Sequence, residues 1–331
     1  MNETRLLAAL LLLSQVFLSA RGGTRVSPPA LYSGMCDASA GVALSDRLFA
    51  VASDEDSVIR VYSREEPGLP VRTIDLSAFL DLDPRRPESD LEGGARVGNR
   101  VYWITSHGRS RTGRERLSRR RFFATDIVVE GKSGRVELKM AGRPCENLLG
   151  ALLREPKLAR FKLAEASERE PKARGGLNIE GLSGTPDGSL LIGFRNPVPN
   201  GKALVVPLLN PDALLQGKAA KLGDPLLLDL GGLGIRDLSF WDGKWLVIGG
   251  PYDGRGESRL FKWAGGTAAP QPIKHARLKG LNPEAIIFYQ DKGWGDVQIL
   301  SDDGTRRVDG KPCKELANPN RRQFRSVWVT P

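Results

Sequence analysis

One pattern recurs five times along the chain, and it restricts the fold more than any other feature. Each copy opens a short strand with an acidic residue, makes a tight turn, and enters a strongly apolar strand. The acids are Asp37, Glu92, Glu180, Asp237 and Glu284, and the apolar strands are 48–54, 101–107, 190–196, 245–250 and 297–303. Turns such as Asp187-Gly188 accept the positive φ that tight hairpins need. Each copy therefore predicts a β-hairpin.

Two further strand candidates follow each hairpin. They are 58–64 and 71–77; 122–130 and 136–141; 203–209 and 226–230; 259–263 and 272–278; and 305–309 and 325–330. Four strands repeated at a period of about 50 residues are typical of propeller blades. The sequence predicts an all-β protein, a β-propeller of about five four-stranded blades in one domain over residues 21–331. Six blades, or a β-sandwich, are the alternatives.

An excess of sequence separates the second copy from the third. Within it, 147–153 and 158–166 show helix-like spacing of apolar residues, with Pro156 between them. We expect a helical insertion over about 145–174 that lies across the channel mouth beside Glu180. A degenerate sixth blade in this stretch is the alternative.

The segment Gly108–Arg121 carries seven arginines and one glutamate. It predicts a long loop between the second and third strands of its unit. The loop is either solvated or an arm that binds anions.

The amino terminus has the features of a signal peptide over residues 1–20. Arg5 supplies positive charge, residues 6–18 are mostly apolar, and Leu18-Ser19-Ala20 offers small residues for cleavage. The apolar run is short for a membrane span. We expect a periplasmic or secreted protein with no transmembrane segment after signal cleavage, and an uncleaved anchor is the alternative. No oligomeric state follows from the sequence.

The net charge of +10, together with export, restricts the classes of partner that we expect. A basic exported protein meets small anionic molecules or envelope components, so nucleic acid is not expected. Two histidines and three cysteines argue against zinc. The cysteines allow one disulfide, and we expect Cys145–Cys313, because both lie in polar segments that contain proline. The other pairings with Cys36 stay open.

Propeller topology predicts where a site lies. First strands line the channel and successive strands run antiparallel, so the five repeat acids should ring one mouth. The ends of the second strands should form a neighbouring ring of Asp54, Ser106, His107, Arg195, Asn196, Asp302 and Asp303.

Crowded carboxylates need a cation or arginines, or else take up protons. Calcium or another divalent cation suits an oxygen-rich set. The candidate metal ligands are Asp37, Glu92, Glu180, Asp237 and Glu284. The candidate catalytic residues are His107, Glu180 and Asp237, and Arg195, Asn196 and Arg236 are candidates for binding an anionic substrate. The alternative for each acid is a structural role, accepting backbone N–H bonds between blades or pairing with the arginines.

Several phrases together are distinctive. They are Cys36-Asp-Ala-Ser-Ala-Gly41, Asn178-Ile-Glu-Gly-Leu182, Gly193-Phe-Arg-Asn-Pro197, Gly234-Ile-Arg-Asp-Leu238 and Asn282-Pro-Glu-Ala-Ile286. With them the chain resembles, from about Tyr32 to its end, the bacterial family catalogued as domain of unknown function 3616. That resemblance implies no activity. The stretch around Glu180 is also similar to phytase-like propellers labelled esterase-like, and propellers of the lactonase and paraoxonase type are similar in placing calcium at this mouth.

Two functions stay open, and the sequence does not decide whether the protein is an enzyme. The first is a non-catalytic ligand-binding or scaffolding protein of the cell envelope. The alternative is a calcium-type metal-dependent hydrolase of an ester, lactone or phosphoester. A Gly-x-Ser-x-Gly elbow, a phosphate loop and a dinucleotide fingerprint are all absent from the sequence.

Overall fold

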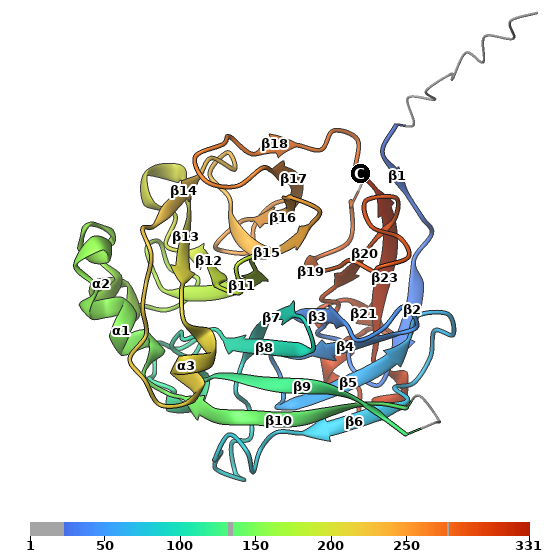
Figure 1. Ribbon diagram of the computed structural model, residues 1–331. Coiled ribbons are helices and arrows are strands. Elements are labelled where there is room, and N and C mark those ends of the chain that lie inside the picture. Colours follow the sequence, from blue (N-terminus) through green and yellow to red (C-terminus); the bar gives the residue numbers. More distant parts are fainter. Residues whose placement is uncertain (1–22, 132–134, 277) are drawn as a thin grey trace, which may run out of the picture.

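Five antiparallel sheets surround a central channel, so the protein is a five-bladed β-propeller, as predicted (Figure 1). The computed structural model describes residues 23–131, 135–276 and 278–331. The predicted signal peptide lies outside these residues. Within them, no helix is both long and apolar enough to cross a membrane.

The first four blades are each built from four consecutive strands. Blade 1 contains β3 (Ala40–Ala43), β4 (Leu48–Ala52), β5 (Val58–Ser63) and β6 (Arg72–Asp75). Blade 2 contains β7 (Leu91–Val97), β8 (Arg100–Thr105), β9 (Phe122–Glu130) and β10 (Arg135–Cys145). Blade 3 contains β11 (Asn178–Gly184), β12 (Leu190–Asn196), β13 (Ala203–Leu208) and β14 (Leu226–Leu228). Blade 4 contains β15 (Gly234–Trp241), β16 (Lys244–Gly250), β17 (Arg259–Trp263) and β18 (Gln271–Pro272).

Blade 5 closes the ring with both ends of the chain. It contains β19 (Pro283–Ile287), β20 (Val297–Ser301), β23 (Gln323–Thr330), β1 (Arg25–Val26) and β2 (Ala30–Ser33). The amino-terminal strands pair with β23, with Arg25 opposite Thr330 and Ala30 opposite Ser326. The outer strand of the last blade therefore comes from the start of the chain.

This closure corrects the predicted strands of the fifth copy. The stretch 305–309 is not a blade strand, since it contributes only β21 (Arg307–Val308), which pairs with β22 (Lys311–Pro312) in a separate hairpin. The strand predicted as the fourth of its blade, β23, is the third. A repeat read forward along the chain could not supply a strand from the opposite end.

Apolar strands are buried on both faces because each blade lies between two others. In β8, residues 101–105 are all buried. Trp103 packs in the apolar cluster shared with blade 1, whereas Tyr102 and Ile104 pack in the cluster shared with blade 3. An inner strand therefore reads as a continuous apolar run, unlike the alternating pattern of a sheet with one face in water.

The segment between blades 2 and 3 contains α1 (Leu148–Arg154), η2 (Pro156–Phe161) and α2 (Leu163–Ser167). Leu148, Leu152 and Phe161 are buried in the cluster between these blades, and Figure 1 shows α1 and α2 on the outside of the ring. The helices therefore do not lie across the channel mouth, and the expected position of the insertion is wrong. The segment that follows them reaches the mouth face, where the carbonyls of Pro171 and Ala173 accept hydrogen bonds from Asn196, each 2.7 Å long.

Short helical turns occupy the remaining loops. They are η1 (Leu117–Arg119), η3 (Pro199–Gly201), α3 (Pro211–Leu215), η4 (Cys313–Glu315) and η5 (Pro319–Arg321).

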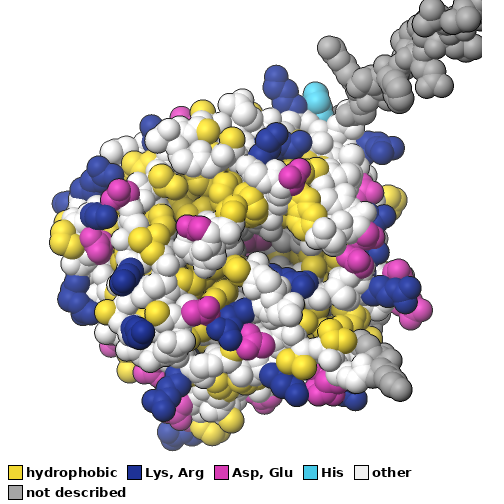
Figure 2. All heavy atoms as spheres, in the orientation of Figure 1, with side chains coloured by type: hydrophobic (Ala, Val, Ile, Leu, Met, Phe, Trp, Pro, Cys, Tyr) yellow, Lys and Arg dark blue, Asp and Glu magenta, His cyan; other side chains and the backbone are white. Residues whose placement is uncertain are grey.

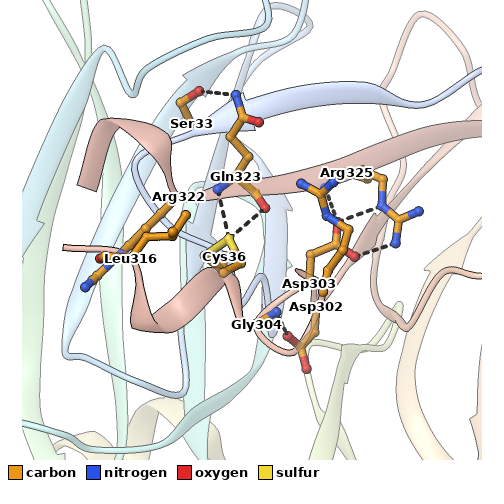
Figure 3. The surroundings of a disulfide bond; sticks show 11 residues. Ser33, Cys36, Asp302, Asp303, Gly304, Leu316, Arg322, Gln323 and Arg325 are labelled. Carbon is orange, nitrogen blue, oxygen red and sulfur yellow. Dashed lines mark hydrogen bonds and ion pairs between the residues drawn. A yellow bond between two sulfur atoms is a disulfide. The ribbon is translucent and has the colours of Figure 1, made fainter. Parts of the chain in front are cut away.

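The disulfide joins Cys36 to Cys313, so the expected Cys145–Cys313 pairing is wrong (Figure 3). Cys36 precedes blade 1, and Cys313 lies in the loop between β20 and β23 of blade 5. Ring closure brings the two Cα atoms to 6.0 Å. Cys145 ends β10 on blade 2 and keeps a free thiol. The disulfide fastens the two blades that meet at the closure.

Replacing Cys36 or Cys313 with serine should lower the free energy of unfolding by about 2–5 kcal/mol, because the disulfide closes a very long loop of the unfolded chain. Thermal denaturation with and without a reductant measures the effect. Cys145→Ser is the matched control and should change the melting temperature little. Equal melting temperatures for all three variants and the parent protein would show that the strand pairing of β23 alone closes the ring.

Candidate functional site

A β-bulge at the start of the first strand recurs in blades 2 to 5. In blade 2, Leu91 pairs with Thr105 and Gly93 pairs with Ile104, which leaves Glu92 as the extra residue. The corresponding extra residues in the next three blades are Glu180, Arg236 and Glu284. A bulge breaks the alternation of side chains and re-aims the extra one. Four blades thereby direct one charged side chain each to the same mouth of the channel.

The fourth blade departs from the prediction, because Arg236 and not Asp237 occupies the bulge. Both carboxylate oxygens of Asp237 accept backbone N–H bonds, from Leu238 at 2.8 Å and from Ile286 at 2.7 Å. The side chain of Asp237, which was predicted as a metal ligand and a catalytic residue, thus ties β15 to β19, as the structural alternative for the repeat acids describes. Aligning Ile179-Glu-Gly-Leu with Ile235-Arg-Asp-Leu would have placed Arg236 opposite Glu180.

The bulge residues of blades 3 to 5 form a buried ionic chain. Arg195 Nη1 lies 2.6 Å from Glu180 Oε1, and Arg236 Nε lies 3.2 Å from Glu180 Oε2. Arg236 Nη2 pairs in turn with Glu284 Oε1. All four side chains are almost fully buried, and two acids balance two guanidinium groups. The predicted meeting of Glu180, Arg195 and Arg236 is therefore present as a neutral network.

An asparagine two residues before the bulge supports each of these glutamates. Asn178 Nδ2 donates to Glu180 Oε1 at 2.8 Å, and Asn282 Nδ2 donates to Glu284 Oε1 at 3.1 Å. These amides add hydrogen bonds to the charged form of the carboxylate, which favours ionisation.

Blade 2 carries Asp90 where blades 3 and 5 carry the asparagine. An ionised carboxylate cannot donate to Glu92. Asp90 instead accepts from Ser106 Oγ and pairs with Arg119 Nη1 at 3.0 Å. Glu92 makes no hydrogen bond or ion pair with any other described residue. The replacement of an amide by an acid leaves this side of the mouth with excess negative charge.

Asp54 joins two groups of carboxylates on that side. Oxygens of Asp54, Asp90 and Glu92 lie within 4.8 Å of one another, and so do oxygens of Asp37, Asp54 and Glu55. Asp54 is partly exposed, but its Oδ1 is buried and has no hydrogen-bond partner within the described part of the chain. We call Asp37, Asp54, Asp90 and Glu92 the acidic cluster.

Burial dominates the electrostatics of the acidic cluster. Burial, and then the neighbouring Asp302, raises the pKa of Asp37 to about 8. Burial raises the pKa of Asp90 to about 6 although Arg119 opposes the shift. Burial also raises the pKa of Asp54 well above its usual value, with Asp302 and Asp37 adding to the effect. Burial, followed by the charges of Glu180 and Asp90, raises the pKa of Glu92 well above its usual value.

Asp302 contributes from the end of β20. Its Oδ2 accepts from Asn282 Nδ2 at 3.0 Å, and its Oδ1 accepts from the backbone N–H of Gly304 at 2.8 Å. Gly304 packs against the carboxylate of Asp37 so closely that a Cβ atom would overlap it. The loop after β20 therefore places the carboxylate of Asp302 near the cluster.

The side chains of His107, Asn196 and Asp303 bond to groups outside the cluster. His107 Nδ1 donates to the carbonyl of Thr105 at 2.8 Å, and burial lowers the pKa of His107 to about 4. The charges of Arg120 and Arg121 also lower the pKa of His107, so the imidazole is neutral. Asn196 holds the segment after α2, as described above. Asp303 pairs with Arg325 at 2.7 Å (Figure 3).

Sequence reasoning missed Asp90, Asn178, Asn282 and Arg119. The first three share one signal, an Asn or Asp two residues before the bulge glutamate, at 90–92, 178–180 and 282–284. Arg119 comes from the arginine-rich loop, where its Nη1 reaches Asp90 and its Nη2 pairs with Glu88. That loop therefore contributes one cation to the edge of the mouth.

The fold and the site define a five-bladed propeller with an acidic channel mouth. The family described as "Protein of unknown function (DUF3616)" matches residues 37–123 and 129–290, and the chain belongs to this family. No curated protein matches the sequence.

Solved structures of low sequence identity are also similar to this chain. Glutaminyl cyclase from Myxococcus xanthus is 12% identical with a TM-score of 0.46, over 92% of this chain and 96% of that one. A gluconolactonase from Xanthomonas campestris is 14% identical with a TM-score of 0.40, over 85% and 80%. Similarity at this level carries no argument about activity.

The cluster makes the stability of the chelator-treated protein depend on pH. Asp37 titrates near pH 8 in the folded state instead of near its usual 3.8, so the folded protein binds more protons between these values. The contribution of Asp37 to stability must therefore fall as the pH rises through this interval. His107, whose pKa is lowered to about 4, acts in the opposite direction only below its usual pKa of 6.5. We therefore expect a higher melting temperature at pH 6.5 than at pH 8, since about 1 kcal/mol shifts a domain of this size by about 2–4 °C.

Asp37→Asn is the control for this pH dependence, because it removes the proton that Asp37 binds. Its melting temperature should fall less between pH 6.5 and pH 8 than that of the parent protein. A melting temperature that rises across the interval would contradict the account of the cluster.

Proposed function

We propose that this protein is an exported, non-catalytic binding propeller that holds a calcium-type cation in the acidic cluster and captures a small anionic molecule through it. The observation that carries the proposal is the position of Asp54. Its buried Oδ1 has no partner among the described residues, and it lies between two groups of carboxylates. A cation bound there would satisfy the free oxygen and relieve the repulsion.

The donor set fits a hard divalent cation. Calcium binds six to eight oxygens from mono- or bidentate carboxylates, carbonyls and water. Asp54, Asp90 and Glu92 would supply the protein's share, with Asp37 and Glu55 on the other side of Asp54. Metal binding would also favour the ionised carboxylates, so affinity should fall as the pH drops.

The buried arginines are already neutralised by glutamates, so the positive charge that attracts an anion must come from the bound cation. Glu180 and Glu284 already balance Arg195 and Arg236. A bound cation would add positive charge on the opposite side of the mouth. The net charge of +10 adds a long-range attraction for anionic molecules.

This arrangement favours binding over hydrolysis of an ester, lactone or phosphoester. A hydrolase would need the same cation together with a group that moves protons. His107 was predicted for that role, but its Nδ1 is bonded to Thr105 and its charged neighbours are Arg120 and Arg121. Glu180 is held by two arginines, and Asp237 by two backbone N–H groups.

Export to the periplasm or the medium is part of the proposal. The apolar sequence near the amino terminus supports it, and a disulfide that closes the ring suits an oxidising compartment. The ligand would then be an anionic small molecule or an anionic component of the envelope.

Calcium titrated into chelator-treated protein should bind and raise its melting temperature. Asp54→Asn should abolish both effects without lowering the stability of the metal-free protein, because it removes a repelling charge. Isothermal titration calorimetry and thermal denaturation measure the two effects.

Two control variants separate the site from general damage. Asp56→Asn, in the same turn but outside both carboxylate groups, should bind calcium like the parent protein. Asp237→Asn should lose about 1–3 kcal/mol of stability, since an amide cannot accept both backbone N–H bonds, and should still bind calcium. Calcium binding that survives in Asp54→Asn, or that is absent from the parent protein, would overturn the proposal.

A further inference from the structure

A second cavity lies at the opposite end of the channel from the acidic cluster. Its volume is about 740 Å³, and the first strands of all five blades and the turns that follow them line it. The acids and arginines of the acidic cluster and the ionic chain lie near the starts of first strands or the ends of second strands, and none of them lines this cavity. Figure 2 shows the centre of the molecule hollowed, with hydrophobic and charged side chains around the hollow. We call this space the distal cavity.

Several small residues of the first strands line the distal cavity. Its walls include Gly41, Ala43, Gly94, Ala95, Ser183 and Gly184. A Cβ atom at Gly41 would overlap side chains of blade 5, and one at Gly94 or Gly184 would overlap a valine of the preceding blade, so these glycines let the first strands approach closely. The volume falls within the range of cavities that bind small molecules.

Two aromatic side chains of blade 4 line the cavity, and each is held by a second aromatic ring. Trp241 stacks on Phe288, with ring centroids 5.7 Å apart and planes inclined by 15°. Phe240 packs against Trp245 at 4.6 Å, and Trp245 is fixed by its hydrogen bond to Ser183 Oγ at 3.1 Å. Both Phe240 and Trp241 remain partly exposed. The rings therefore offer apolar surfaces that need no reordering when a ligand arrives.

A fixed guanidinium group lines the same cavity from blade 2. Arg96 Nε donates to the carbonyl of Gly98 at 2.8 Å, and Nη1 donates to the carbonyls of Ala43 and Leu44 at 3.0 and 3.1 Å. Among the described residues no carboxylate lies within ion-pair distance of Arg96. Burial lowers the pKa of Arg96, and the nearby Asp46 offsets this effect only in part. The remaining N–H groups of Arg96 are thus free to bind an acceptor oxygen.

Arg96 and Asp46 are the charged residues that line the cavity, and the other polar residues of its lining are neutral. Asp46 offers acceptor oxygens, and Ser45, Thr185, Ser239 and Gln290 offer neutral donors and acceptors. One aspartate offsets one arginine. The cavity therefore combines aromatic surfaces with several hydrogen-bonding groups and almost no net charge.

We propose that the distal cavity binds a neutral saccharide, with a sugar ring against Trp241 and its hydroxyl groups hydrogen-bonded to Arg96 and Asp46. A pyranose ring has an apolar face of C–H bonds and a rim of hydroxyl groups. Aromatic side chains suit the first and mixed donors and acceptors suit the second. This site does not rest on the cation proposed for the acidic cluster.

The test measures binding of cellotriose, triacetylchitotriose and trigalacturonic acid to the full chain by isothermal titration calorimetry, after chelator treatment so that no cation at the acidic cluster can bind the anionic sugar. We expect at least one of the two neutral trisaccharides to bind, and trigalacturonic acid to bind more weakly. Trp241→Leu and Arg96→Gln should each weaken binding by about tenfold or more. Trp241→Phe, which keeps an aromatic ring, should retain it, and Asp54→Asn at the other mouth should bind sugar like the parent protein.

Three results would overturn this proposal. One is the lack of measurable binding of any of the three sugars at about 10 mM. Another is a folded Trp241→Leu or Arg96→Gln variant that binds as tightly as the parent protein. The third is tighter binding of trigalacturonic acid than of both neutral sugars, which would assign the cavity to an anionic ligand. Thermal denaturation identifies any variant that fails to fold, and the other variant then decides.

Discussion

Charges buried at the channel mouth are the constraint on which the rest of the site depends. A bulge in four of the first strands directs one charged side chain per blade toward the same mouth, where little water can screen it. Glu180, Arg236 and Glu284 satisfy this constraint by pairing across blades 3, 4 and 5. Such a chain ties the blades together, and removing one member would leave an unpaired buried charge at a cost of about 3–5 kcal/mol.

Blades 1 and 2 meet the same constraint differently. Blade 2 places Asp90 where its neighbours place an asparagine, and blade 1 has no bulge and brings Asp37 and Asp54 instead. The result is a mouth with a neutral half and an acidic half. In the neutral half, ion pairs hold neighbouring blades together. In the acidic half, the carboxylates repel one another, and a bound cation would relieve this repulsion. We therefore assign the cation to Asp54 and its neighbours.

Local features were predictable from the sequence, and features that join distant parts of the chain were not. The hairpins of each blade depend on nearby turns such as Asp187-Gly188, so the five blades followed from the repeat. The closure by β1 and β2 and the Cys36–Cys313 disulfide depend on contacts between the two ends, which no local pattern records. Asp237 was aligned with Glu180 because both are acidic, whereas Arg236 occupies the bulge of blade 4, and only the neighbouring Ile and Leu of the phrase show that alignment. His107 was placed by its strand-end position, whereas its positive φ and its bond to Thr105 turn it toward the arginine-rich loop.

The central claim is that the acidic half of the mouth is a cation site. Crystals grown with a lanthanide in place of calcium test it most directly, since anomalous scattering locates the bound ion. The account predicts a strong peak within coordination distance of Asp54 Oδ1 and of oxygens from Asp90 and Glu92, and its loss in Asp54→Asn crystals. A mouth without an anomalous peak, in crystals whose ions bind only at exposed surface carboxylates, would contradict it.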